Sequence, residues 1–203
     1  MNDHPFLLIP MAAIALYVMY LWRQDYRSFR SGQPNPHALP GATPCSPLAC
    51  VIAGLGALAI LAAETLGELH LGLSEQQSTI TILFGIYSLL AAFIEELIFR
   101  GFIVIENRGK FLRLLGIVGA SLLFAALHPF LWKWGDSGFH WTVNMKGWFS
   151  TSAVFVSSLW FYTVRFAAFN PNQSLIPSIT GHAVKNLGVI CIKAMQGFIV
   201  GGW

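Results

Sequence analysis

The chain has few charged residues. Of its 203 residues, only 10% are Lys, Arg, Asp or Glu, against roughly 25% in an ordinary soluble domain. This scarcity, together with a hydrophobic content of 55%, excludes a typical water-soluble fold and favours a membrane protein with several spans. The net charge is +3 and the basic residues are scattered, so we expect no nucleic-acid partner.

The sequence also lacks paired cysteines and a recognisable secretory leader. Cys45, Cys50 and Cys191 form no CxxC pair and lie far from any His-x3-5-His motif, so neither a disulfide framework nor a zinc ribbon is expected. The opening residues, MNDHPFLLIP, lack the basic region of a secretory signal. We therefore expect the first apolar run to stay as a membrane span.

Long apolar runs are abundant. They predict six helices, at about 6–22, 48–67, 79–105, 115–132, 148–169 and 175–201. Only helices satisfy backbone polar groups in lipid over such lengths. The predicted fold class is therefore all-α, a polytopic transmembrane helical bundle of about six spans that forms a single integral membrane domain over residues 1–203. The Pro-rich segment 33–47 must lie outside the hydrocarbon, because proline breaks helices.

Basic residues predict the orientation of the bundle. The loops 23–47 and 106–114 each carry three arginines or lysines, Arg165 lies near the end of the fifth run, and the loop 68–78 has none. The positive-inside rule then places the first two loops in the cytoplasm and both termini outside. Two lysines in the loop 133–147 run against this rule. The short chain and short loops favour a bacterial cytoplasmic membrane.

The third apolar run contains charges where charge is costly. Glu95, Glu96 and Arg100 fall within six residues, and each costs about 2.5–3.5 kcal/mol at the bilayer centre. Glu96 and Arg100 are spaced i, i+4, which predicts an ion pair. Glu95 lies about 100° around the helix from Glu96 and has no local counter-ion. Taken alone, these charges fit a structural ion pair plus a neutral carboxyl, or a shallow position near headgroup water.

Further polar residues lie in other apolar runs. His128 is in the fourth run, one turn after Phe124, and His182 and Asn186 are one turn apart in the sixth. A site that joins them to Glu95 requires all of them to lie at one depth. Helix rise then predicts that the third helix runs to about 108 and the fourth begins near 116, with 110–115 along the membrane interface.

Three spaced motifs are similar to those of a known family. Glu95-Glu96-x-x-x-Arg100, Phe124-x-x-x-His128 and His182-x-x-x-Asn186, which span residues 95–186, resemble the ordered signature motifs of the CAAX protease and bacteriocin-processing family of intramembrane glutamic proteases. The resemblance implies an active site within the membrane core, with no cofactor and no metal. It implies a water activated by Glu95 and His128, and an oxyanion held by His182 and Asn186.

The resemblance also implies supporting residues and a class of substrate. Glu96 and Arg100 would support the site, and we interpret Phe124 as a wall of the cavity. The expected partner is a membrane-associated peptide or protein tail, which could be a CAAX-type tail, a bacteriocin leader or a C-terminal sorting signal. Lys185, Lys193 and Arg165 are expected to snorkel to the interface or to pair with acidic groups.

Two other functions stay open at the level of sequence. Glu95, His128 and His182 could form the three-ligand zinc site of an intramembrane metalloprotease, although the chain has no HExxH motif. A non-enzymatic membrane protein could instead use the same polar cluster to bind a peptide, confer immunity or conduct protons. The aromatic loop 133–147 could line a substrate entry or form part of an aromatic belt.

Overall fold

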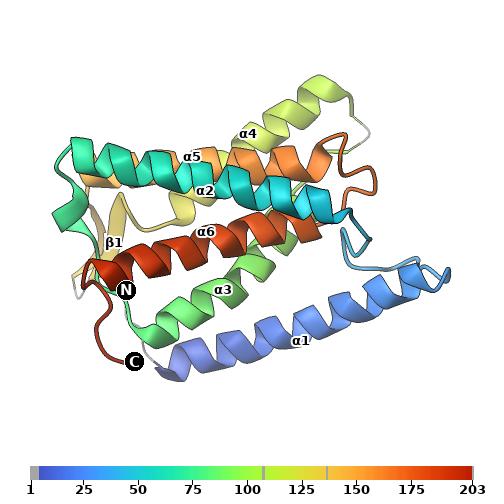
Figure 1. Cartoon of the computed structure of the whole chain (residues 1–203), viewed down its shortest axis with the longest axis horizontal. Coiled ribbons are helices and arrows are strands. Elements are labelled where there is room, and N and C mark those ends of the chain that lie inside the picture. Colours follow the sequence, from blue (N-terminus) through green and yellow to red (C-terminus); the bar gives the residue numbers. More distant parts are fainter. Residues whose placement is uncertain (1–4, 107, 136, 203) are drawn as a thin grey trace.

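The fold is a bundle of six α-helices, as predicted. A computed structural model describes residues 5–106, 108–135 and 137–202. Its α-helices are α1 (Pro5–Arg30), α2 (Pro47–His70), α3 (Ile82–Glu96), α4 (Lys110–Leu127), α5 (Met145–Phe166) and α6 (Ile176–Met195). The start of α1 and the end of α6 lie at the same end of the bundle (Figure 1), which agrees with an even number of crossings.

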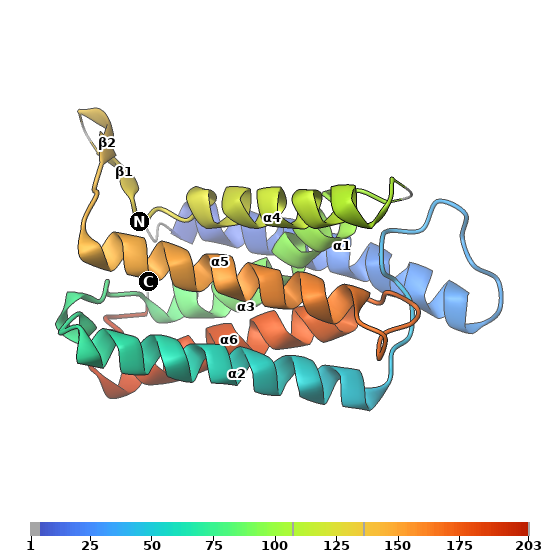
Figure 2. The ribbon, with the colours of Figure 1, turned by 90° about the horizontal axis from the view of Figure 1, so that it is seen from above.

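Four of the helices are long and apolar enough to cross a membrane within the described residues. They are α1, α2, α4 and the continuous helix Ile82–Phe102, with mean hydropathies of 1.8–2.0. The helices α5 and α6 are 22 and 20 residues long but more polar. Their polar side chains are largely buried, because α5 and α6 pack against each other and against α2, α3 and α4. The helix α5 therefore lies between α4 and α2 (Figure 2), and α6 packs against α2 and α3.

Polar caps set where several helices begin. The side chains of Ser46, Thr81 and Asn144 accept hydrogen bonds from backbone N–H groups in the first turns of α2, α3 and α5. Such caps satisfy donors that have no partner inside the helix. Pro47 follows Ser46 at a first-turn position, where proline needs no N–H partner.

The predicted boundary between the third and fourth helices is wrong. The third helix does not reach residue 108. It continues beyond α3 as a π-helix, η2 (Leu97–Phe102), and ends there. The fourth begins at Lys110, so the segment 110–115 is helical and does not form a separate interfacial stretch. The Tyr162 hydroxyl lies 2.5 Å from the carbonyl oxygen of Phe99 and 3.1 Å from that of Ile103. This contact from α5 holds the last turn of η2 in place, and the sequence around Phe102 alone does not predict it.

The loop 133–147 contains a small antiparallel hairpin. Strands β1 (Trp132–Gly135) and β2 (Gly138–Trp141) pair in register from Trp132 opposite Trp141 to Gly135 opposite Gly138. The hairpin projects sideways at one end of the bundle, on the side where α4 lies (Figure 2). Lys146, which follows it, forms an ion pair with Glu68. That ion pair neutralises the charge of one of the two lysines that contradict the positive-inside pattern.

The Pro-rich segment 33–47 is anchored to the opposite end of the bundle. The Trp22 indole donates a hydrogen bond to the Pro40 carbonyl at 3.0 Å, and Leu175 N donates to the Gly41 carbonyl at 3.1 Å. Trp22 and Leu175 also join Phe93 and other apolar residues in a buried cluster. The loop therefore packs against the helix ends near η2 and the end of α5.

Candidate active site

Glu96 and Arg100 form a fully buried ion pair, which confirms the i, i+4 prediction. Arg100 Nη1 lies 3.1 Å from Glu96 Oε1, and both side chains have no exposed surface. Arg100 also donates through Nη2 to the Ser158 hydroxyl at 2.6 Å and to the Ser158 carbonyl at 3.2 Å. Ser158 in turn donates to the Ser121 hydroxyl at 2.9 Å. These bonds offset part of the cost of burying the two charges, while Glu96 Oε2 and Arg100 Nε have no hydrogen-bond partner among the described residues.

Aromatic rings surround the guanidinium of Arg100. Its Cζ atom lies 4.5 Å from the ring centroid of Phe124, 4.9 Å from that of Tyr162 and 5.3 Å from that of Phe161. Such contacts stabilise a desolvated cation. Phe124 is 3% exposed, and its ring also meets the His128 ring edge-on at 4.7 Å. Phe124 therefore joins Arg100 to a candidate catalytic histidine and is more than a cavity wall.

His182 lies between the two glutamates. Its Nδ1 atom is 2.8 Å from Glu96 Oε1 and its Nε2 atom is 3.6 Å from Glu95 Oε2, while its ring stacks on Phe161 at 4.9 Å. A carboxylate paired with arginine only accepts hydrogen bonds, so Nδ1 carries the proton that it shares with Glu96. In the neutral ring, the lone pair is then on Nε2, the nitrogen nearer Glu95.

The two glutamates differ in access. The side chain of Glu95 is 33% exposed, whereas that of Glu96 is fully buried. Glu95 has no partner on its own helix, as predicted, and its Oε2 atom lies 3.6 Å from Nε2 of His182 on α6. One carboxylate is therefore held in a closed network, and the other is reachable by water or substrate.

His128 ends α4 as its C-cap residue. Its Nδ1 atom lies 2.8 Å from the Phe124 carbonyl oxygen, which can only accept, so Nδ1 carries the proton and Nε2 keeps a free lone pair in the neutral ring. The Glu95 carboxylate is close enough to His128 for an electrostatic interaction between the two side chains. No hydrogen bond joins Glu95 directly to His128 in the part of the chain that the structure describes.

Asn186 is turned toward the backbone of α3. Its amide nitrogen donates to the Ser88 carbonyl at 3.0 Å, which leaves its second N–H available. Asn186 and His182 are one helical turn apart. The residue that precedes Asn186, Lys185, pairs with Glu64 of α2 at 2.9 Å.

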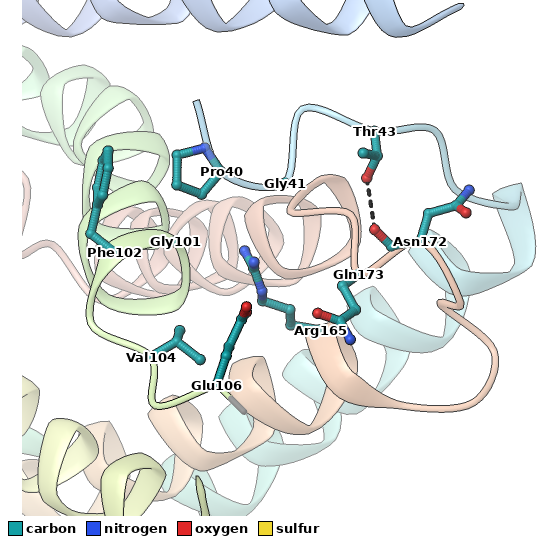
Figure 3. Close-up of a pocket in the computed structure, with 10 residues that line it drawn as sticks. All are labelled: Pro40, Gly41, Thr43, Gly101, Phe102, Val104, Glu106, Arg165, Asn172 and Gln173. Atoms are coloured by element: carbon teal, nitrogen blue, oxygen red, sulfur yellow. Dashed lines mark hydrogen bonds between the residues drawn. The ribbon is translucent and has the colours of Figure 1, made fainter. Parts of the chain in front are cut away.

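The expected pairing with an acidic group is confirmed for Lys185, whereas the partners of Lys193 are neutral. Lys185 pairs with Glu64, and Lys193 donates to Gln77 and to the Ser78 carbonyl. The prediction is wrong for Arg165, which lies beside the Pro-rich loop (Figure 3), is 4% exposed and has Nε and Nη1 atoms without a hydrogen-bond partner among the described residues.

No sequence motif pointed to the residues that α5 contributes to the candidate site. Ser158, Phe161 and Tyr162 hold Arg100 and His182 in place, yet none of them belongs to a spaced motif. The signal available was the density of serines in an apolar run, which favours buried contacts between helices. As for metals, no group of three or more His, Cys, Asp or Glu side chains among residues 5–106, 108–135 and 137–202 is arranged to hold an ion.

Comparison with known proteins identifies the family. A family model described as type II CAAX prenyl endopeptidase Rce1-like matches residues 77–188, more than half of the chain, and this range contains all three motifs. The chain matches no curated protein and no solved structure. With its apolar helices, the chain is an integral membrane protein, and it belongs to the type II CAAX prenyl endopeptidase Rce1-like family of proteases.

Proposed function

We propose that this protein is an intramembrane glutamic endopeptidase that hydrolyses a peptide bond in a membrane-associated peptide or protein tail. The observation that carries the proposal is the asymmetry of the two adjacent glutamates. Glu96 is buried against Arg100 and His182, whereas Glu95 is partly exposed and lies near an imidazole. Only Glu95 of this pair can reach a water molecule and a substrate.

In the proposed mechanism, Glu95 is the general base. Its carboxylate accepts a proton from a water molecule whose other side is oriented by the free Nε2 of His128. The resulting hydroxide attacks the carbonyl carbon of the peptide bond, and the carbonyl oxygen becomes an oxyanion. The protonated Glu95 then delivers its proton to the leaving nitrogen, and the C–N bond breaks. General-base catalysis of this kind contributes about 10²–10⁴-fold to rate.

Asn186 and His182 are proposed to hold the oxyanion. Asn186 has one amide N–H that is not donated to Ser88. The Nδ1–H of His182 is committed to Glu96, so His182 can donate to the oxyanion only through Nε2, as an imidazolium. Loss of one such donor costs about 10²–10³-fold in kcat in other hydrolases.

Glu96 and Arg100 act as positioning residues in this proposal. The buried ion pair fixes Nδ1 of His182, while Phe124 connects the same guanidinium to His128 through its ring. Both candidate histidines are thereby oriented by one buried network. Side chains held in this way need little reorganisation when charge develops in the transition state.

The test is cleavage of fluorogenic peptides by purified protein in detergent or neutral vesicles. We expect Glu95→Gln and His128→Ala to lower kcat/KM by at least 10²-fold. Glu75→Gln and His37→Ala are matched controls, because both residues are exposed and lie outside the motifs, and these variants should keep wild-type turnover. Turnover by Glu95→Gln equal to that of wild type contradicts the proposal, and binding without cleavage by wild type favours a non-enzymatic role.

The orientation is also a proposal. We infer that the end of the bundle carrying Arg108, Lys110 and Arg113 faces the cytoplasm of a bacterial cell, with both termini outside. Reporter fusions at the C-terminus and in the loop 68–78 should then report an external location. Replacing Arg108, Lys110 and Arg113 by acidic residues should change the location that the reporters show. An unchanged topology after this replacement contradicts the assignment.

A further inference from the structure

The β1–β2 hairpin has two chemically different faces. Residues that lie directly opposite each other in antiparallel strands share a face, and so do residues two apart along one strand. The register therefore gathers four aromatic side chains on one side of the hairpin. This aromatic face consists of Trp132, Trp134, Phe139 and Trp141.

The four rings form one continuous patch. The Phe139 ring meets the Trp141 ring edge-on, with centroids 5.0 Å apart. It also lies close to the Trp132 and Trp134 rings, at 5.9 and 6.4 Å. These contacts leave the patch open, because Trp134 is 76% exposed and Trp141 is 70% exposed. A two-stranded hairpin gains little stability in water by itself, so the aromatic face is suited to a partner that covers it.

The opposite face of the hairpin is polar. Lys133 lies opposite His140 in the register, and both side chains are exposed. His140 Nε2 is 2.7 Å from the Ser137 hydroxyl. Among the described residues of the two strands, the ionisable side chains are thus on one face and the aromatic side chains on the other. Such a division suits the boundary between lipid and water, where one face is wet and the other meets acyl chains.

The hairpin lies where this boundary is expected. It is at one end of the bundle and projects across the direction of the helices (Figure 2). The helix α4 is long and apolar enough to cross a membrane, and Leu123 and Leu127 near its end are 48% and 56% exposed. The Trp132 indole donates a hydrogen bond to the Ala126 carbonyl at 2.8 Å. The hairpin therefore begins where the lipid-facing surface of α4 ends, and its direction is that of the membrane surface.

A short hydrogen-bonded segment joins the hairpin to His128. Strand β1 begins four residues after His128, the C-cap residue of α4. The backbone N–H of Phe130 donates to the His128 carbonyl at 2.8 Å, and the two rings stack with centroids 6.0 Å apart. Just after β2, the backbone N–H of Thr142 donates to the Leu131 carbonyl at 2.8 Å. A shift of the hairpin is therefore transmitted to the His128 side chain.

We propose that the β1–β2 hairpin binds the headgroup region of the lipid bilayer through its aromatic face, and that this contact positions His128. The positioning role rests on the proposed function, whereas the lipid contact does not. Indole and phenyl rings are stable at the level of the headgroups, while Lys133 and His140 stay in water. The aromatic face carries no charged side chain, so a zwitterionic lipid is a sufficient partner.

The experiment measures tryptophan fluorescence of the protein in phosphatidylcholine vesicles. The difference in emission between wild type and Trp134→Phe isolates the emission of Trp134. Phosphatidylcholine brominated in its acyl chains should quench this emission by about half or more, because the ring lies at the headgroup level. Iodide in the water should quench it little. Quenching by iodide and not by brominated lipid shows that the hairpin stands in water, and it overturns the proposal.

A matched control uses the polar face of the same hairpin. In the Trp134→Phe background, His140→Trp adds an indole one residue before Trp141 and on the opposite face. We expect iodide to quench this added emission and brominated lipid to have little effect. Equal quenching of both faces by brominated lipid contradicts the assignment of the aromatic face.

Other occupants of the aromatic face give a different result. A second copy of the chain or a bound peptide would shield Trp134 from lipid as well as from water. Protection of Trp134 from both quenchers therefore identifies a protein on this face and overturns the lipid proposal.

Trp132→Phe tests the positioning of His128. This variant keeps a ring on the aromatic face but removes the N–H that donates to the Ala126 carbonyl. We expect unchanged quenching of Trp134, which verifies that the hairpin is folded. The kcat for a fluorogenic peptide should fall by roughly tenfold with little change in KM, because small displacements of a catalytic group are costly. Trp148→Phe, in the first turns of α5 and 56% exposed, should keep the wild-type kcat. An unchanged kcat in Trp132→Phe overturns the positioning role.

Failure of this proposal is distinguishable from failure of the proposed function. Quenching of Trp134 in Glu95→Gln protein should equal that in wild type, whether or not wild type cleaves a peptide. Quenching by brominated lipid without any cleavage refutes only the protease proposal. Cleavage without such quenching refutes only the lipid contact of the hairpin.

Discussion

His182 on α6 shares its Nδ1 proton with Glu96 on α3, across a distance of 2.8 Å. The same Glu96 oxygen lies 3.1 Å from Arg100 Nη1, so one buried atom orients both the histidine and the arginine. This shared oxygen makes Glu96 a structural centre of the site, although the neighbouring Glu95 is the proposed base.

Glu96→Gln should destabilise the protein more than Glu95→Gln does. Neutralising Glu96 leaves the buried Arg100 without its counter-ion, and breaking a buried pair in this way costs about 3–5 kcal/mol. Glu95 is partly exposed and its replacement should cost little stability. Thermal unfolding in detergent measures both effects. A larger loss of stability in Glu95→Gln than in Glu96→Gln contradicts the assignment of the two residues.

Tyr162→Phe should weaken the end of the third helix. The variant removes the hydroxyl that contacts the carbonyls of Phe99 and Ile103, and the loss of such a buried bond costs about 1–3 kcal/mol. Hydrogen exchange followed by mass spectrometry should show faster exchange in η2. Tyr17→Phe is the control, because Tyr17 is 63% exposed, and equal exchange in the two variants counts against the role of Tyr162.

Lys185 and Glu64 should behave as a coupled pair. Lys185→Met leaves a carboxylate of which 17% is exposed without its partner at 2.9 Å, and we expect a loss of about 1–3 kcal/mol. Adding Glu64→Leu should recover most of that loss, because an apolar pair of similar size is tolerated. A double-mutant cycle measured by unfolding tests this coupling. Strict additivity of the two single effects rules it out.

Chelation should leave the proposed activity unchanged. In the glutamic mechanism, the water is activated by a carboxylate and an imidazole, so prolonged dialysis against a strong chelator should not lower kcat/KM. Elemental analysis of the dialysed protein verifies that bound zinc has been removed. Loss of activity on chelation, restored by one equivalent of zinc, supports the metalloprotease alternative and refutes the glutamic one.

The sequence predicted one local ion pair of the candidate site better than the path of the chain around it. Glu96 and Arg100 were paired correctly, because i, i+4 spacing is a local property of a helix. The end of the third helix at Phe102 was missed, because a hydroxyl from α5 fixes it. The two donors of Arg165 that have no hydrogen-bond partner among the described residues were also missed, since only the packed loop around Gly41 shows which acceptors are within reach.

The buried polar side chains of α6 have a consequence for how the protein enters the membrane. The third helix carries its own counter-ion, since Glu96 and Arg100 are on the same segment. The sixth does not, because Lys185 depends on α2 and His182 depends on α3. Glu64 and Glu96 both precede α6 in the chain. Synthesis from the N-terminus therefore places these carboxylates in the bilayer before Lys185 and His182 are inserted.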